Sequence, residues 1–245
     1  MSSHRVRILG ALALTLTSLH AANATFAPLP ASVLVRPDRI FSPIHFDDND
    51  NAQFVFEATL ISTCEKAGLF RAEVDPTALT ITLDAREFIY SSAWCAQLES
   101  TYSGVVSLGV LPAGSYAIQA KLPDGSLLQV GVLPVAHARS ANPDDFLYAP
   151  VESMHLEGGA SSTRPILVLN GTYSNGCGRM KQVKLHRAPH LIEVLPIAEI
   201  RTSHCTSSPA VFEERVELGP VSAGDRVLIH VRSLNGQALN QVHQF

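Results

Sequence analysis

The chain has 245 residues, of which 46% are hydrophobic and 16% charged, and its formal net charge is −4 with neutral histidines. This charge argues against nucleic acid as the main partner, because phosphate binding needs an excess of Lys and Arg. No P-loop, G-x-G-x-x-G, G-x-S-x-G or H-E-x-x-H motif occurs. We therefore expect a protein without a cofactor and without enzyme activity.

Residues 1–24 are expected to form a secretory signal peptide. Arg5 and Arg7 precede an apolar run from Ile8 to Leu19, and Ala22-Asn23-Ala24 fits a small-x-small cleavage site. The apolar run is shorter than the roughly 20 residues that span a bilayer, and no later segment approaches that length. The sequence thus predicts a periplasmic or secreted protein with no transmembrane anchor.

The rest of the chain divides into a leader, two domains and a linker. Residues 25–45 are proline-rich and are expected to be extended, contributing an edge strand to the first domain. We expect one domain over residues 46–135 and a second over residues 151–245. Residues 136–150 contain the turn signal Asn-Pro-Asp-Asp and are interpreted as the linker.

The C-terminal part of the chain repeats a pattern found earlier. The offset that separates Cys95 from Cys205 also relates five residues of each copy: Val106, Leu108, Gly109, Ala113 and Gly114 match Val216, Leu218, Gly219, Ala223 and Gly224. Several features in one order indicate a duplication. Two domains of roughly 100 residues are each large enough to bury a core.

Each copy predicts strands rather than helices. Apolar or alternating runs of four to eight residues lie between Gly, Pro and Asp, for example residues 54–61, 79–83, 105–109 and 115–120. Asp124-Gly125 and Asn235-Gly236 predict hairpins with type I′ turns between the last two strands of each copy, because both turn residues then need positive φ. The predicted fold class is all-β, with two tandem antiparallel β-sandwiches.

The four cysteines occur as two in each copy. Cys64 and Cys95 fall in the first predicted domain, and Cys177 and Cys205 fall in the second. In an exported protein, an even number of cysteines at a repeated spacing predicts one disulfide within each domain. Free buried thiols are the alternative interpretation.

The segment LGVLPAGSYAI (Leu108–Ile118), with a weaker copy LGPVSAGDRVLI (Leu218–Ile229), resembles the last strands of tandem immunoglobulin-like modules in exported bacterial proteins. The resemblance covers the C-terminal half of each predicted domain. It implies immunoglobulin-like sandwiches and favours a binding or structural role. No Trp lies between the cysteines at the core spacing of antibody domains.

Trp94 is the only tryptophan and immediately precedes Cys95. Because side chains alternate across a strand, a Cys95 that points into the sandwich would turn Trp94 outward. Trp is enriched in binding hot spots, and Phe88 and Tyr90 are possible companions. Two alternatives are that Trp94 packs against the other domain or the leader, and that the segment is irregular.

His186 and His190 flank a turn at Ala188-Pro189. Across a short hairpin their imidazoles could converge with His204 or Glu193 on a transition metal, and exposed histidines without a metal are the alternative. Two acidic groups also stand out. Asp47–Asn51 resembles a calcium loop but lacks its glycine and distal glutamate, and Asp144-Asp145 lies on the linker, so both are interpreted as solvated.

These observations favour an exported, non-enzymatic binding protein or a structural module of the cell envelope. Its expected partner is a protein or glycan of the envelope or the outside, and self-association through sheet edges is possible. One alternative is a secreted inhibitor or effector that acts on a hydrolase by inserting the loops around Trp94 and Thr202–Pro209. The other is a metal-binding protein.

Overall fold

The computed structural model describes residues 29–91, 94–142, 144–158, 163–201, 203 and 205–245. The predicted signal peptide lies outside this part of the chain. Sixteen strands and one short 3₁₀ helix account for the regular structure of the described residues, which contain no α-helix. None of their helical structure is long and apolar enough to cross a membrane.

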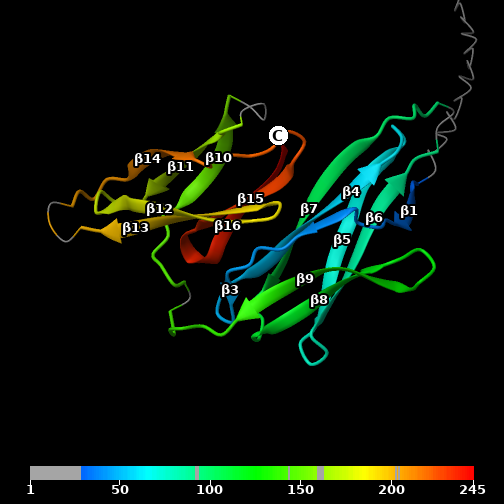
Figure 1. The fold of residues 1–245 in the computed structure, drawn as a ribbon, viewed down its shortest axis with the longest axis horizontal. Coiled ribbons are helices and arrows are strands. Elements are labelled where there is room, and N and C mark those ends of the chain that lie inside the picture. Colours follow the sequence, from blue (N-terminus) through cyan, green and yellow to red (C-terminus); the bar gives the residue numbers. More distant parts are fainter. Residues whose placement is uncertain (1–28, 92–93, 143, 159–162, 202, 204) are drawn as a thin grey trace, which may run out of the picture.

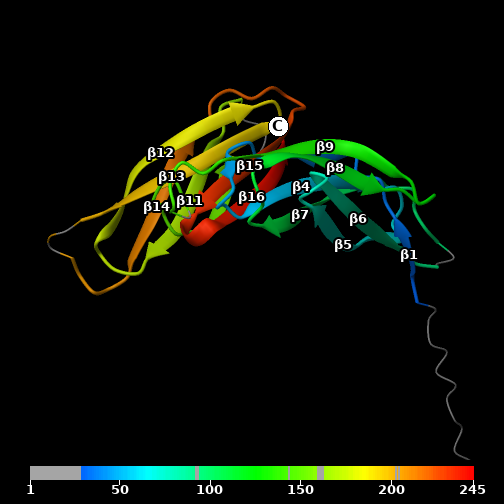
Figure 2. The same cartoon turned by 90° about the horizontal axis from the view of Figure 1, so that it is seen from below.

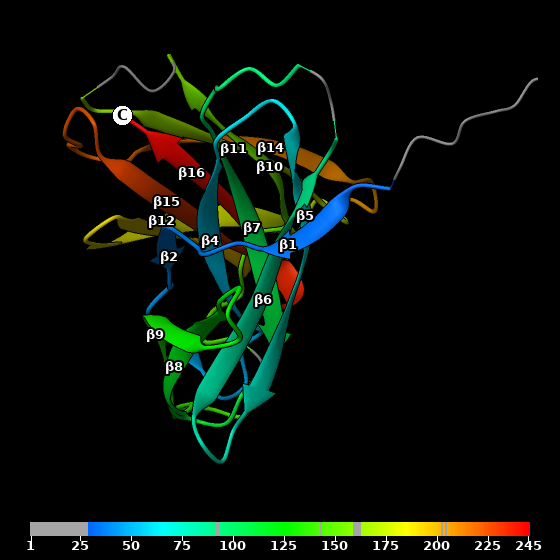
Figure 3. The same ribbon diagram turned by 90° about the vertical axis from the view of Figure 1, so that its right-hand side faces the viewer.

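The strands form four sheets, two from residues 29–136 and two from residues 151–245, which we term the N-terminal half and the C-terminal half. The two halves lie side by side along the long axis of the molecule (Figures 1 and 2). Seen along that axis, the N-terminal half lies in front of the C-terminal half (Figure 3).

The N-terminal half has a three-stranded sheet in the order β2-β4-β7 and a sheet in the order β1-β6-β8-β9-β3, with β5 also paired to β6. The bounds are β1 Ala31–Leu34, β2 Arg39–Phe41, β3 Phe46–Asp47, β4 Ala52–Leu60, β5 Glu65–Asp75, β6 Thr80–Ile89, β7 Ser100–Gly109, β8 Gly114–Lys121 and β9 Leu127–Ala136. The leader therefore supplies β1, a short strand that pairs with the end of β6 (Figure 3).

The C-terminal half repeats this pairing without counterparts of β1 and β3. Its sheets run β10-β11-β14 and β12-β13-β15-β16. The bounds are β10 Val151–Glu157, β11 Ile166–Tyr173, β12 Gly178–Ala188, β13 Leu191–Ile200, β14 Ala210–Glu217, β15 Arg226–Ser233, the 3₁₀ helix Leu234–Gly236 and β16 Gln237–Gln244. The repeated sequence pattern thus corresponds to a repeated strand order, and β7 and β14 begin at the same offset that separates Cys95 from Cys205.

The ladders are not all antiparallel, and on this point the sequence-based prediction was wrong. β6 pairs with β8 in parallel, and β13 pairs with β15 in parallel. In each half an intervening strand of the other sheet, β7 or β14, carries the chain across, which brings the two strands together in one direction. This parallel pair departs from the two antiparallel sheets of an immunoglobulin domain.

Both predicted hairpins form, but their turns differ. Asn235 and Gly236 have φ of 61° and 67°, as a type I′ turn requires. In the first hairpin Gly125 has φ of 84°, whereas Asp124 does not have positive φ. The Gly125 N–H donates to the Leu122 carbonyl at 2.9 Å, which fits a type I turn followed by a left-handed glycine, so the type I′ prediction was wrong there.

Each half has its own apolar core between its two sheets. In the N-terminal half, Phe54 and Phe56 of β4 pack with Ile81, Leu83 and Ile118 of the opposite sheet. The core of the C-terminal half contains equivalent residues, including Leu167, Leu169, Val194, Ile229 and Val231. The alternation expected for strands with one buried face is clear in β8, where every second residue from Tyr116 to Ala120 is buried.

The predicted disulfides are confirmed. Cys64 is bonded to Cys95, and Cys177 is bonded to Cys205. The first disulfide follows β4 and the second lies where β13 ends, and these strand ends point to opposite ends of the long axis (Figure 1). Each disulfide therefore closes the loops at the outer end of its own half.

Ile118 and Ile229 occupy matching places in the two halves and are fully buried. Truncation of Ile229 to Ala should lower the free energy of unfolding by about 2–5 kcal/mol, because it removes buried methyl groups and leaves a cavity. Urea denaturation monitored by circular dichroism tests this. The exposed Val211→Ala variant is the control, and a loss below about 1 kcal/mol for Ile229→Ala would contradict the assignment of the core.

Candidate functional sites

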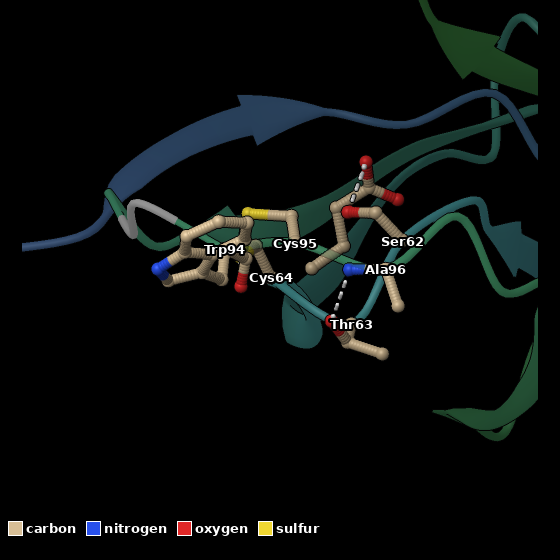
Figure 4. Close-up of a disulfide and its surroundings, with 7 residues drawn as sticks. Ser62, Thr63, Cys64, Trp94, Cys95 and Ala96 are labelled. Carbon is tan, nitrogen blue, oxygen red and sulfur yellow. Dashed lines mark hydrogen bonds between the residues drawn. A yellow bond between two sulfur atoms is a disulfide. The ribbon is translucent and has the colours of Figure 1, made fainter.

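The first candidate site surrounds the Cys64–Cys95 disulfide. The segment after β4 runs beside the segment before β7, and the Thr63 N–H donates to the Ala96 carbonyl at 3.0 Å. In return, the Ala96 N–H donates to Thr63 Oγ1, also at 3.0 Å (Figure 4). These hydrogen bonds and the disulfide hold two irregular segments against each other.

Large apolar side chains are exposed around this disulfide. Trp94 is 89% exposed, Leu98 61% and Ile61 57%, and Ile89 and Tyr90 are also exposed. Figure 4 shows the Trp94 indole directed away from the paired backbone segments. We call Ile61, Ile89, Tyr90, Trp94 and Leu98 the apolar tip.

The exposure of Trp94 has a different cause from the one expected. Residues 94–99 form no strand, and Cys95 is itself exposed, so the alternation argument does not apply. Phe88 lies within β6 between β1 and β5 and is half-buried. Sequence reasoning missed Ile61 and Leu98, although each lies three positions from a disulfide-bonded cysteine.

The second candidate site is the junction between the halves. Phe41 and Val55 of the N-terminal half pack on Leu191 and Leu228 of the C-terminal half, and these four side chains are buried. This small apolar contact joins β2 and β4 to β13 and β15.

Two ion pairs flank that contact, one partly buried and one buried. Arg226 binds the Glu57 carboxylate through Nε at 2.9 Å and through Nη2. Its hydrogen bonds with Glu57 raise the pKa of Arg226. Arg232 binds Asp50 in the same two-point manner and also donates to Asp144 Oδ1 at 3.2 Å. Each arginine belongs to β15 and each main partner to the other half, so the pairs cross the junction.

A cluster of imidazoles and one carboxylate lies at the edge of the junction. Glu193 of β13 is 2% exposed, and its Oε1 accepts the Ile44 N–H at 2.8 Å. His45 contacts the other carboxylate oxygen through Nδ1, and its Nε2 lies 3.1 Å from Nδ1 of His186. Burial and then the nearby His45 lower the pKa of His186.

These three side chains bring possible metal-ligand atoms close together. One ligand atom from each of His45, His186 and Glu193 lies within 4.8 Å of the other two. Imidazole nitrogens and a carboxylate oxygen are a ligand set that transition metals take. The cluster opens into a cavity of about 400 Å³ that is also lined by His230, Lys184 and Arg232.

His230 lies on β15 directly beside Glu193 in the parallel ladder and is 1% exposed. Asn240 Nδ2 donates to Gln53 Oε1 at 3.1 Å, which leaves Asn240 Oδ1 as the atom that faces His230. This oxygen accepts a hydrogen bond from the Nδ1–H of His230 at 2.8 Å. The Nε2 of His230 is then an acceptor, and it has no hydrogen-bond partner among the described residues. Burial lowers the pKa of His230 to about 4, so the ring is neutral.

The predicted metal ligands are only partly brought together. His186 and Glu193 are cross-strand partners in the β12–β13 hairpin. His190 lies at the turn of that hairpin, where its Nδ1 is 3.1 Å from the Arg226 carbonyl, and it is not part of the cluster. His204 lies outside the described residues. His45 was missed, because it is far from His186 along the chain and nothing local in the sequence relates the two.

The acidic groups interpreted as solvated have structural partners. Asp50 is buried in its ion pair with Arg232. Asp48 accepts the Ala138 N–H at 2.8 Å, and this hydrogen bond lowers the pKa of Asp48. Asp144 reaches Arg232. These carboxylates therefore stabilise the junction and its linker, and the solvated interpretation fails for Asp50.

Truncation of Arg232 to Ala should lower the free energy of unfolding by about 3–5 kcal/mol, because it leaves the Asp50 carboxylate buried without its partner. The control is Arg215→Ala, which breaks an exposed pair with Glu157 and should cost less than about 1 kcal/mol. Equal losses for the two variants, measured by urea denaturation, would show that the junction pair is not buried in solution.

Comparison with known proteins adds no assignment to these sites. No protein-family model matches the chain. Searches of curated proteins and of solved structures also find no significant match. The functional argument therefore depends on the residues of the two sites.

Proposed function

We propose that the protein is an exported, non-catalytic binding protein that docks its apolar tip onto another protein. The observation that carries this proposal is the exposure of five large apolar side chains around one disulfide, with Trp94 almost fully exposed. Large exposed apolar patches on folded proteins mark interaction sites. Trp and Tyr are also among the residues that contribute most to binding energy.

The composition of the tip favours a protein over a glycan or a membrane. Ile61, Ile89 and Leu98 are aliphatic, whereas a glycan site needs several polar groups around its aromatic rings. Anionic membrane surfaces attract clusters of Lys and Arg. Directly behind the tip lies the carboxylate of Glu65, which accepts the Ile61 N–H at 2.6 Å, and the chain as a whole is negatively charged.

The architecture supports the same role. We infer that the halves are two related sandwich modules, because they share one strand order and each has its own core. The ion pairs at the junction join them, so the tip is presented on a stiff support. Disulfides persist in oxidising compartments, which supports export. Membership of the immunoglobulin-like modules stays a prediction.

Trp94 provides both the test variant and the readout, since it is the only tryptophan. A photoreactive amino acid at position 98 should cross-link to one protein from the producing organism's envelope or culture fluid. With that protein purified, binding should shift the Trp94 emission to the blue and shield it from iodide. The Trp94→Ala variant should bind about 10-fold more weakly or worse, as measured by calorimetry, while Val211→Ala should bind normally.

Three results would overturn this proposal. Equal affinity of the wild type and Trp94→Ala would remove the tip from the interface. A blue shift with anionic phospholipid vesicles or with envelope oligosaccharides, but not with the cross-linked protein, would replace the protein partner. Concentration-dependent sedimentation that disappears in Trp94→Ala would identify a second copy of the chain as the occupant.

A further inference from the structure

We propose that His45, His186 and Glu193 bind a divalent transition metal, with Zn²⁺ as the best fit, across the junction between the two halves. This site is separate from the apolar tip and does not depend on the function proposed for it. The argument uses the donor set, the charge balance of Glu193 and the unpartnered nitrogen of His230.

The donor set selects the class of metal. Two imidazoles and one carboxylate are typical of zinc sites that keep a fourth position open. Calcium and magnesium prefer oxygen ligands throughout. Nitrogen atoms bound to one tetrahedral zinc lie about 3.3 Å apart for Zn–N bonds of about 2.0 Å. The facing nitrogens of His45 and His186 are 3.1 Å apart, close to that spacing. The Glu193 carboxylate contacts the opposite nitrogen of His45, Nδ1, and has to turn from it to reach the same ion.

A backbone hydrogen bond holds the Glu193 carboxylate in place. The Ile44 N–H donates to Glu193 Oε1 at 2.8 Å, which leaves Oε2 as the oxygen available to a metal. Such hydrogen bonds to a metal ligand orient it and are a regular feature of metal sites. Because Ile44 and His45 are adjacent in the leader, the same short segment supplies one ligand and orients another.

Within the described part of the chain, Glu193 has no Lys or Arg partner. Its carboxylate is buried, and the only ion pair found for it among the described residues is with His45. Three permanent cations line the cavity, Arg139, Lys184 and Arg232, and none of them is found paired with Glu193 among the described residues. Lys184 Nζ lies 4.4 Å from the centre of the Phe146 ring, and Arg232 is bound to Asp50. A divalent ion would supply the charge that a buried carboxylate needs.

His230 provides a second, independent indication of a ligand. Its buried Nε2 has a lone pair and no partner in the described structure, although buried polar atoms are nearly always paired. The ring lines the same cavity and lies beside Glu193 in the ladder. We assign His230 as a positioning residue, whose Nε2 accepts a hydrogen bond from a water carried by the metal.

Metal binding here would join the halves. His45 comes from the N-terminal half, while His186 and Glu193 come from the β12–β13 hairpin of the C-terminal half. A metal that binds only the assembled junction stabilises the folded chain by mass action. Binding also displaces protons from the imidazoles, so the affinity should fall as the pH is lowered.

The test uses the mature protein, stripped with EDTA and dialysed against limiting Zn²⁺. The wild type should retain about one Zn²⁺ per chain by mass spectrometry of the metal, and Zn²⁺ should raise its melting temperature. Replacing Zn²⁺ with Co²⁺ should give the visible absorption of a tetrahedral site. The His186→Ala variant should bind at least about 100-fold more weakly by calorimetry, and His230→Gln about 10-fold more weakly.

His190→Ala is the matched control, because this histidine lies on the same hairpin but outside the cluster. It should bind Zn²⁺ as the wild type does. His186 is only partly buried, so its variant is expected to fold, which circular dichroism checks independently. Substoichiometric Zn²⁺ in the wild type, or equal affinities for His186→Ala and His190→Ala, would overturn the site.

Discussion

The junction between the halves depends on buried charge. Arg226 and Arg232 extend from β15 of the C-terminal half, and their main partners, Glu57 and Asp50, belong to the N-terminal half. A guanidinium or carboxylate is tolerated inside a protein only when it is paired and hydrogen-bonded. If the halves separated, the four charged groups of these pairs would have to be hydrated again. Each arginine also makes two hydrogen bonds to its carboxylate, and this geometry fixes the position of one half relative to the other. Other contacts across the junction, such as that of His45 with Glu193, depend on this relative position.

His45 illustrates that dependence. It lies between β2 and β3, in a leader with little regular structure, and it meets Glu193 only because the neighbouring ion pairs and the Phe41 contact hold the leader against β13. The interior of the C-terminal half contributes Glu193 and His230 as adjacent residues of parallel strands. A site assembled from both halves can respond to their separation, whereas a site within one half cannot. The apolar tip does not depend on the junction. One disulfide and the hydrogen bonds beside it hold the tip together within the N-terminal half.

The two halves repeat one strand order and differ in a few places. The two halves share their strand order, the parallel pair and the position of the disulfide. They differ where function is proposed. Trp94 corresponds to a histidine in the second copy. Among the described residues of the C-terminal half, β1 and β3, which His45 directly precedes, have no counterpart. Both candidate sites thus use residues that only one copy has, while the shared residues form the cores.

The sequence by itself determined the class of fold, both disulfides and both final hairpins, because these depend on local patterns: alternation of apolar residues, glycine in tight turns and repeated cysteine spacing. It also named His186 as a metal ligand, with Glu193 as one of two possible partners, but its second ligand, His190, lies outside the cluster. Only the tertiary structure decided the parallel pairs, the burial of Asp50 and the meeting of His45 with His186. The physical reason is that these contacts join segments far apart along the chain or depend on how two sheets stack, and no local preference of the chain encodes such distances.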